Sequence, residues 1–163
     1  SHLGVLQRFS VPARQQRCPG PVTTWFDVAH NLQAVSALAE QLQAECVQGT
    51  TRAVFSMLQD KDIAGTIEVM KGCVDRWYLA ELEGPRALGI SELRTSLSGV
   101  EVADLSTSTA PRDVYRAALE DSQPGDRLVV FGSFYLVGPA MSSLGLYSAP
   151  SQPGEQTAKW SGV

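Results

Sequence analysis

Short apolar runs alternate along this chain with stretches in which apolar residues recur every three or four positions. The short runs predict strands, and the periodic stretches predict amphipathic helices. We expect strands at residues 6–11, 22–26, 52–57, 76–80, 100–103 and 127–131. We expect helices at about 31–46, 63–74, 111–121 and 137–144, with a short helix opening at Ser91.

Several of these strands are apolar almost throughout, which is typical of parallel strands that are buried on both faces. Strands separated by helices favour right-handed crossovers. The fold class predicted is therefore α/β: a Rossmann-like three-layer domain with a mostly parallel sheet of about six strands. The run at 6–11, which Pro12 ends, is expected to be the one antiparallel edge strand. Residues 12–21 carry several Pro and Gly and are expected to form a loop.

The composition narrows the class of protein. The chain has 163 residues, 44% of them apolar and 18% charged, with a formal net charge of −4, so we expect one globular domain and no nucleic-acid partner. No apolar run is long enough to cross a membrane. Cys18, Cys46 and Cys73 are widely spaced and form no zinc motif, which fits a reducing cytoplasm. We expect residues 1–147 to form the domain and 148–163 a flexible tail.

Polar or glycine-containing sequence follows four of the predicted strands. The four segments are Asp27-Val-Ala-His30-Asn31, 59–62, 81–86 and Gly132-Ser133. The carboxyl ends of parallel strands lie at one edge of a sheet, and open α/β folds bind their ligands there. We therefore expect a site at this edge.

The same segments carry a resemblance to a known family. The strings Phe-Asp-Val-Ala-His-Asn, Met-Leu-Gln-Asp-Lys-Asp-Ile-Ala-Gly, Trp-Tyr-Leu-Ala-Glu-Leu-Glu-Gly-Pro-Arg and Val-Val-Phe-Gly-Ser-Phe-Tyr-Leu-Val-Gly occur in this order. Together they resemble the C-terminal domain of bacterial folylpolyglutamate synthase/dihydrofolate synthase, of the Mur ligase superfamily. The resemblance implies an ATP-dependent amide ligase, in which dihydropteroate or a folate is activated as an acyl phosphate and the amino group of L-glutamate attacks it.

On the nucleotide side, the resemblance implies contacts from Asp27, His30 and Asn31. Each residue also has a purely structural interpretation. Asp27 can close a turn, His30 can pack against the start of a helix, and Asn31 can cap that helix.

On the glutamate side, the resemblance implies Lys61, Ser133 and Arg86. The structural alternatives are a surface ion-pair cluster around Lys61, a helix cap at Ser133 and an ordinary exposed arginine at Arg86. Asp60 and Asp62 are expected to be structural. The aromatic residues Trp77, Tyr78, Phe131 and Phe134 are expected to lie in the core.

The sequence contains no GxxxxGK[ST] phosphate-binding loop. In the family that the chain resembles, a larger N-terminal ATPase domain supplies this loop and the magnesium ligands. We therefore expect no catalytic residue and no metal ligand in this chain, and no activity from the chain alone. ATP and Mg²⁺ belong to the full-length enzyme, and its N-terminal domain is the expected partner. At the position of a family arginine this chain has Val5, and Arg8 lies three residues further on.

Two other functions fit the same predicted edge. One is a different Mur-type ligase, acting on a peptidoglycan or cyanophycin precursor. The other is a non-catalytic α/β module that binds a nucleotide. Small molecules are the expected ligands in every case.

Overall fold

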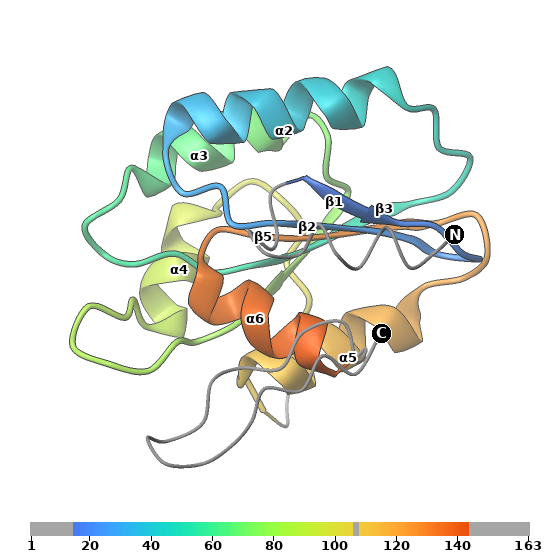
Figure 1. The fold of residues 1–163 in the computed structure, drawn as a ribbon. Helices are drawn as coiled ribbons and strands as arrows, with labels where there is room; N and C mark the ends of the chain where they lie inside the picture. Colours follow the sequence, from blue (N-terminus) through green and yellow to red (C-terminus); the bar gives the residue numbers. More distant parts are fainter. Residues whose placement is uncertain (1–14, 106–107, 144–163) are drawn as a thin grey trace, which may run out of the picture.

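The computed structural model describes residues 15–105 and 108–143, which form one five-stranded sheet in the order β1-β2-β5-β3-β4 (Figure 1). The strands are β1 (Gln16–Cys18), β2 (Thr23–Asp27), β3 (Thr51–Phe55), β4 (Arg76–Leu79) and β5 (Arg127–Phe131). β1 pairs antiparallel with β2, and all other neighbours are parallel. The mostly parallel sheet with one antiparallel edge strand is therefore confirmed.

Helices cover both faces of the sheet (Figure 1). The helices are α2 (Leu32–Ala44), α3 (Ile63–Met70), α4 (Ile90–Ser96), α5 (Pro111–Asp121) and α6 (Phe134–Ser142). α2, α3 and α4 contribute to the core on one face, and α5 and α6 to the core on the other. The predicted three-layer architecture is confirmed.

Successive strand residues point to opposite faces, so each central strand contributes to two cores. Trp25, Phe55 and Phe131 lie in the core under α2 and α3, where the rings of Phe55 and Phe131 are 4.9 Å apart. Their neighbours Phe26 and Val130 lie in the core under α5 and α6. Burial on both faces explains why these strands are apolar almost throughout.

The first part of the sheet differs from the prediction. Residues 16–18, expected in a loop, form β1, because the Pro19-Gly20-Pro21 turn lets them pair with residues 24–26 of β2. The edge strand predicted at 6–11 and the tail predicted at 148–163 lie outside the described residues.

Two later elements also differ. The strand predicted at 100–103 is reduced to one parallel bridge between Trp77 and Val102. The last helix starts at Phe134, three residues before the predicted start at 137, because Ser133 caps it there.

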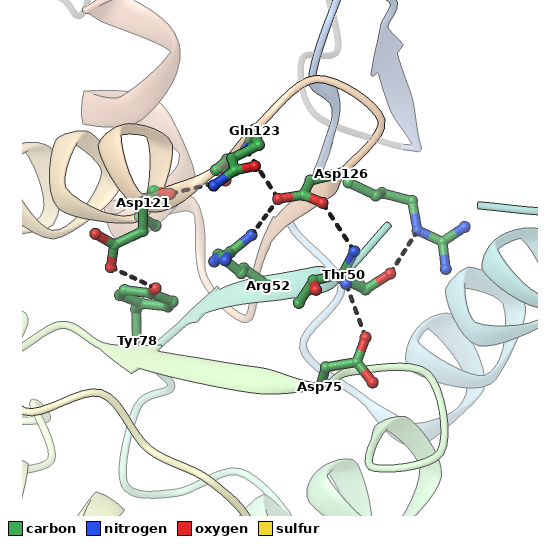
Figure 2. A network of polar contacts seen from close by, with 11 residues as sticks. Thr50, Arg52, Asp75, Tyr78, Asp121, Gln123 and Asp126 are labelled. Atoms are coloured by element: carbon green, nitrogen blue, oxygen red, sulfur yellow. Dashed lines mark hydrogen bonds and ion pairs between the residues drawn. The ribbon is translucent and has the colours of Figure 1, made fainter. Parts of the chain in front are cut away.

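A polar network holds the amino-terminal ends of the central strands together (Figure 2). The carboxylate of Asp126, just before β5, accepts hydrogen bonds from the backbone amide of Thr50 at 2.9 Å and from that of Gln123 at 2.8 Å. It also pairs with Arg52 of β3 at 2.6 Å. This network lies at the opposite edge from the strand exits that carry the candidate site residues.

Candidate functional site

A cleft of about 220 Å³ lies at the carboxyl edge of the sheet, where residues from four strand exits meet. Its lining consists of His30, Leu58, Lys61, Arg86, Gly132, Ser133, Phe134 and Tyr135. Four of the six predicted site residues are therefore brought to one place, and the other two, Asp27 and Asn31, are not among the lining residues. The parallel pairing of β2, β5, β3 and β4 causes this convergence, because it places all four exits at one edge.

The exit of β2 is a tight turn leading into α2. The Asp27 side chain is buried, and its Oδ1 accepts a hydrogen bond from the amide of Ala29 at 2.9 Å. Asn31 Oδ1 accepts from the amide of Ala34 at 2.9 Å and caps α2. His30 is exposed between them, with Nδ1 3.0 Å from the carbonyl oxygen of Val28. The turn thus presents His30 to the cleft, and the nucleotide contacts of all three residues stay predictions.

The exits of β3 and β4 bring two cations to the cleft. Lys61 is half-buried, and Arg86 is exposed. The two aspartates beside Lys61 have other partners: Asp62 caps α3 through the amide of Gly65 at 2.9 Å, and Asp60 pairs with Arg86 at 2.7 Å. Desolvation acts to raise the pKa of Asp60, but the hydrogen bond from Arg86 and the charges of Arg86 and Lys61 outweigh it and lower that pKa.

The exit of β5 depends on a glycine. Gly132 has φ +119°, and a Cβ at this position would collide with the carbonyl oxygen of Ser56. Only glycine accommodates both the positive φ and this close approach. Next to it, Ser133 is 5% exposed, and its Oγ accepts a hydrogen bond from the amide of Tyr135 at 3.1 Å as the cap of α6. An accepting hydroxyl keeps its own proton as a donor for a ligand.

Two aromatic residues of the cleft were missed by the sequence analysis. Phe134, expected in the core, is 42% exposed, and Tyr135 is 63% exposed; their ring centroids are 6.2 Å apart. The prediction for Phe134 is wrong because α6 starts at 134, so both residues lie in its first turn and face the cleft. The structural interpretation of Ser133 as a helix cap already indicated a helix that starts at Phe134.

The cleft suits a small anionic ligand. Lys61 and Arg86 supply positive charge, Ser133 and the His30 ring supply polar groups, and the lining contains no Asp or Glu. Carboxylates and phosphates bind well to such groups through charge-assisted hydrogen bonds.

Neither a metal site nor a membrane span is formed by the described part of the chain. Its residues contain no group of three or more His, Cys, Asp or Glu that would hold a metal ion. The cleft lining also lacks the carboxylates by which Mg²⁺ is usually held. Within the same residues, no helix combines the length and the apolar character needed to cross a membrane.

Fold and cleft together define a class: a doubly wound α/β domain with a cleft at the carboxyl edge of its sheet that is lined by Lys61 and Arg86. Comparison with protein families then identifies the family. The model of the family described as "Mur ligase, glutamate ligase domain" matches residues 8–134. The chain belongs to this family.

The chain is also similar to named proteins. It is 37% identical to the dihydrofolate synthase/folylpolyglutamate synthase of Escherichia coli over 131 residues. This match covers 80% of this chain and 30% of that protein. It is 33% identical to the protein of the same name from Haemophilus influenzae over 118 residues. That match covers 71% of this chain and 27% of the relative. The chain thus spans less than a third of the length of these relatives.

Solved structures agree with these sequence matches. A bifunctional folylpolyglutamate synthase/dihydrofolate synthase with Mn, AMPPNP and L-glutamate bound is similar with a TM-score of 0.72 and 37% identity, over 82% of this chain and 31% of that one. E. coli FolC in complex with DHPP and ADP is similar with a TM-score of 0.73 and 36% identity, again over 82% and 31%.

Proposed function

We propose that this chain is the C-terminal domain of an ATP-dependent ligase that adds L-glutamate to dihydropteroate, to folates, or to both, through an acyl phosphate. The observation that carries the proposal is the cationic cleft formed by Lys61, Arg86 and Ser133, in a chain of the glutamate ligase family. The relatives named above, and the solved structure with L-glutamate and an ATP analogue bound, support this choice of substrates.

In this proposal the cleft holds the incoming amino acid. Lys61 and Arg86 bind carboxylate oxygens of L-glutamate, and the hydroxyl of Ser133 donates a third hydrogen bond. These contacts hold the amino group in line with the acyl phosphate, and such positioning is the main contribution that a binding domain makes to catalysis. His30 is the exposed contact on the nucleotide side, and Asp27 and Asn31 remain candidate nucleotide contacts in the same turn.

The rest of the reaction requires a partner domain. The chain has no GxxxxGK[ST] loop, so we assign phosphate binding and the magnesium ligands to an N-terminal ATPase domain of the same protein. Mg²⁺ there would neutralise charge on the transferred phosphoryl group. Among the described residues, the exposed large apolar side chains are Leu32, Phe134 and Tyr135, at the starts of α2 and α6. We propose that the ATPase domain covers them. The isolated chain is then inactive, and the reaction takes place in the cytoplasm.

The test is a substrate panel on the intact protein that contains this chain. Purified protein is incubated with ATP, Mg²⁺ and labelled L-glutamate, and with dihydropteroate, a reduced folate or a UDP-muramyl peptide as acceptor. The proposal predicts ATP-dependent transfer of label to dihydropteroate or the folate, and none to the muramyl peptide. Transfer to the muramyl peptide alone, or to no acceptor, contradicts it.

A further inference from the structure

The loop that carries Lys61 is fastened to the loop that carries Arg86. The amide of Gln59 donates to the carbonyl oxygen of Arg86 at 2.8 Å, and the Gln59 side chain donates to the carbonyl oxygen of Pro85 at 3.0 Å. One residue earlier, Leu58 forms an antiparallel bridge with Ala87. The two segments lie 26 positions apart in sequence and follow different strands, β3 and β4.

An ion pair completes this connection on the side of the cleft. Arg86 donates to Asp60 Oδ2 at 2.7 Å, and both side chains are about half exposed. Exposed pairs of this kind add little to the stability of a fold. This one joins the residue before Lys61 to the second cation of the cleft.

The side chains of Lys61, Gln59 and Asp60 have different positions relative to the cleft. Lys61 lines the cleft, whereas neither Gln59 nor Asp60 does. The amide of Lys61 donates to the carbonyl oxygen of Leu58 at 3.1 Å, so the Lys61 backbone follows the bridged Leu58. A shift of the loop 83–87 would therefore be transmitted to Lys61 through Leu58, Gln59 and Asp60.

We propose that Asp60 and Gln59 are positioning residues for the amino-acid subsite. Their side chains hold the loop that carries Lys61 against the loop that carries Arg86, and so fix the spacing between the Lys61 ammonium and the Arg86 guanidinium. This inference rests on the proposed function, since it assumes that the two cations bind L-glutamate. A fixed pair of cations matches a dicarboxylate without having to be ordered by it, which lowers the entropic cost of binding.

The inference predicts a selective defect in the intact protein. Asp60→Ala raises the KM for L-glutamate about fivefold, comparable to the loss of one exposed ion pair, and leaves kcat and the KM for ATP within about twofold of the native values. Asp60→Glu restores the carboxylate and most of the native KM. Gln59→Ala acts in the same direction as Asp60→Ala. Glu68→Ala breaks the ion pair with Lys71 on α3, outside the cleft, and serves as the matched control with native kinetics.

Hydrogen–deuterium exchange of the same proteins supplies a readout that does not depend on turnover. Peptides that cover residues 58–62 and 84–87 should exchange faster in Asp60→Ala than in native protein or Glu68→Ala, with an unchanged urea midpoint of unfolding.

The outcomes separate this inference from the proposed function. If the native protein uses L-glutamate but Asp60→Ala has a native KM and native exchange, the positioning role of Asp60 is wrong and the proposed function stands. A fall in kcat for all substrates with a lower unfolding midpoint also overturns it, because Asp60 would then be a general structural residue. A native protein that transfers no glutamate refutes the proposed function and this inference together.

Discussion

Replacing Asp126 with alanine should strongly destabilise the domain, because one carboxylate holds three segments at the amino edge of the sheet (Figure 2). It accepts backbone hydrogen bonds from Thr50, which precedes β3, and from Gln123, which precedes the turn into β5, and it pairs with Arg52. The side chains of Asp126 and Arg52 are only 10% and 15% exposed. Water therefore cannot readily replace the lost contacts.

The size of the effect follows from these contacts. Hydrogen bonds to a charged group contribute about 1.5–3 kcal/mol each, and a largely buried ion pair that loses one partner leaves the other uncompensated. We expect Asp126→Ala to lower the free energy of unfolding by about 3–5 kcal/mol. Asp126→Asn keeps one acceptor oxygen but places an amide NH₂ group against donors, so it should lower the free energy of unfolding by about 2–3 kcal/mol.

The effect should depend on pH in a defined direction. Desolvation acts to raise the pKa of Asp126, but the hydrogen bonds from Gln123, Thr50 and Arg52 outweigh it and lower that pKa below its ordinary value. A carboxyl group with a lowered pKa in the folded state stabilises the protein fully above the unfolded pKa of about 4, and loses this effect as the pH falls through the folded pKa. The difference between native protein and Asp126→Asn should therefore shrink below about pH 4.

Urea unfolding monitored by tryptophan fluorescence measures these differences at pH 7 and at pH 3. Asp113→Asn is the control, since Asp113 lies on the surface in the first turn of α5 and faces Arg116 at 3.8 Å. It should change the free energy of unfolding by less than about 0.5 kcal/mol. A loss below about 1 kcal/mol for Asp126→Ala, or a loss as large at pH 3 as at pH 7, would refute this reasoning.

Three further substitutions test other parts of the structure. Gly132→Ala should prevent native packing at the β5 exit, because of the positive φ and the collision with Ser56; a native thermal melt would contradict this. Asn31→Ala should lower the stability of the chain by about 1 kcal/mol through loss of the α2 cap, whereas Asn31→Asp keeps it; equal urea midpoints for the two variants would be inconsistent with a cap. Tyr78→Phe removes the 2.7 Å hydrogen bond to Asp121 and should lower the free energy of unfolding, measured in urea, by about 1 kcal/mol; an unchanged midpoint would contradict this.

Most of the fold could be predicted because its elements carry local signals. α5 was predicted with its observed bounds, since Pro111 occupies the first helical position. β5 was also predicted with its observed bounds, from the apolar run of residues 127–131. β1 could not be predicted this way, because its three residues have no apolar pattern and become a strand only by pairing with β2. Tertiary pairing of this kind is not visible in a local pattern.

The position of the cleft was predicted, but the contacts of its residues were not. A parallel sheet requires the strand exits to meet at one edge, so the meeting of the exits that carry His30, Lys61, Arg86 and Ser133 followed from the fold class, whereas the choice of these residues came from the family resemblance. Their individual contacts did not follow. Ser133 caps a helix and lines the cleft at once, and its residue type is equally suited to both tasks. The pairing of Asp60 with Arg86, rather than with Lys61, depends on how two loops pack.

The KM for L-glutamate of a Lys61→Gln variant of the intact protein tests the central claim most directly, with Lys71→Gln as its control. Both substitutions remove one lysine charge, but Lys61 lines the cleft and Lys71 pairs with Glu68 on the surface of α3. Loss of a charge-assisted hydrogen bond to a carboxylate should raise the KM for L-glutamate about tenfold or more in Lys61→Gln, with the KM for ATP unchanged. Lys71→Gln should keep the native value. Equal KM values for L-glutamate in the two variants would contradict a glutamate site in this cleft.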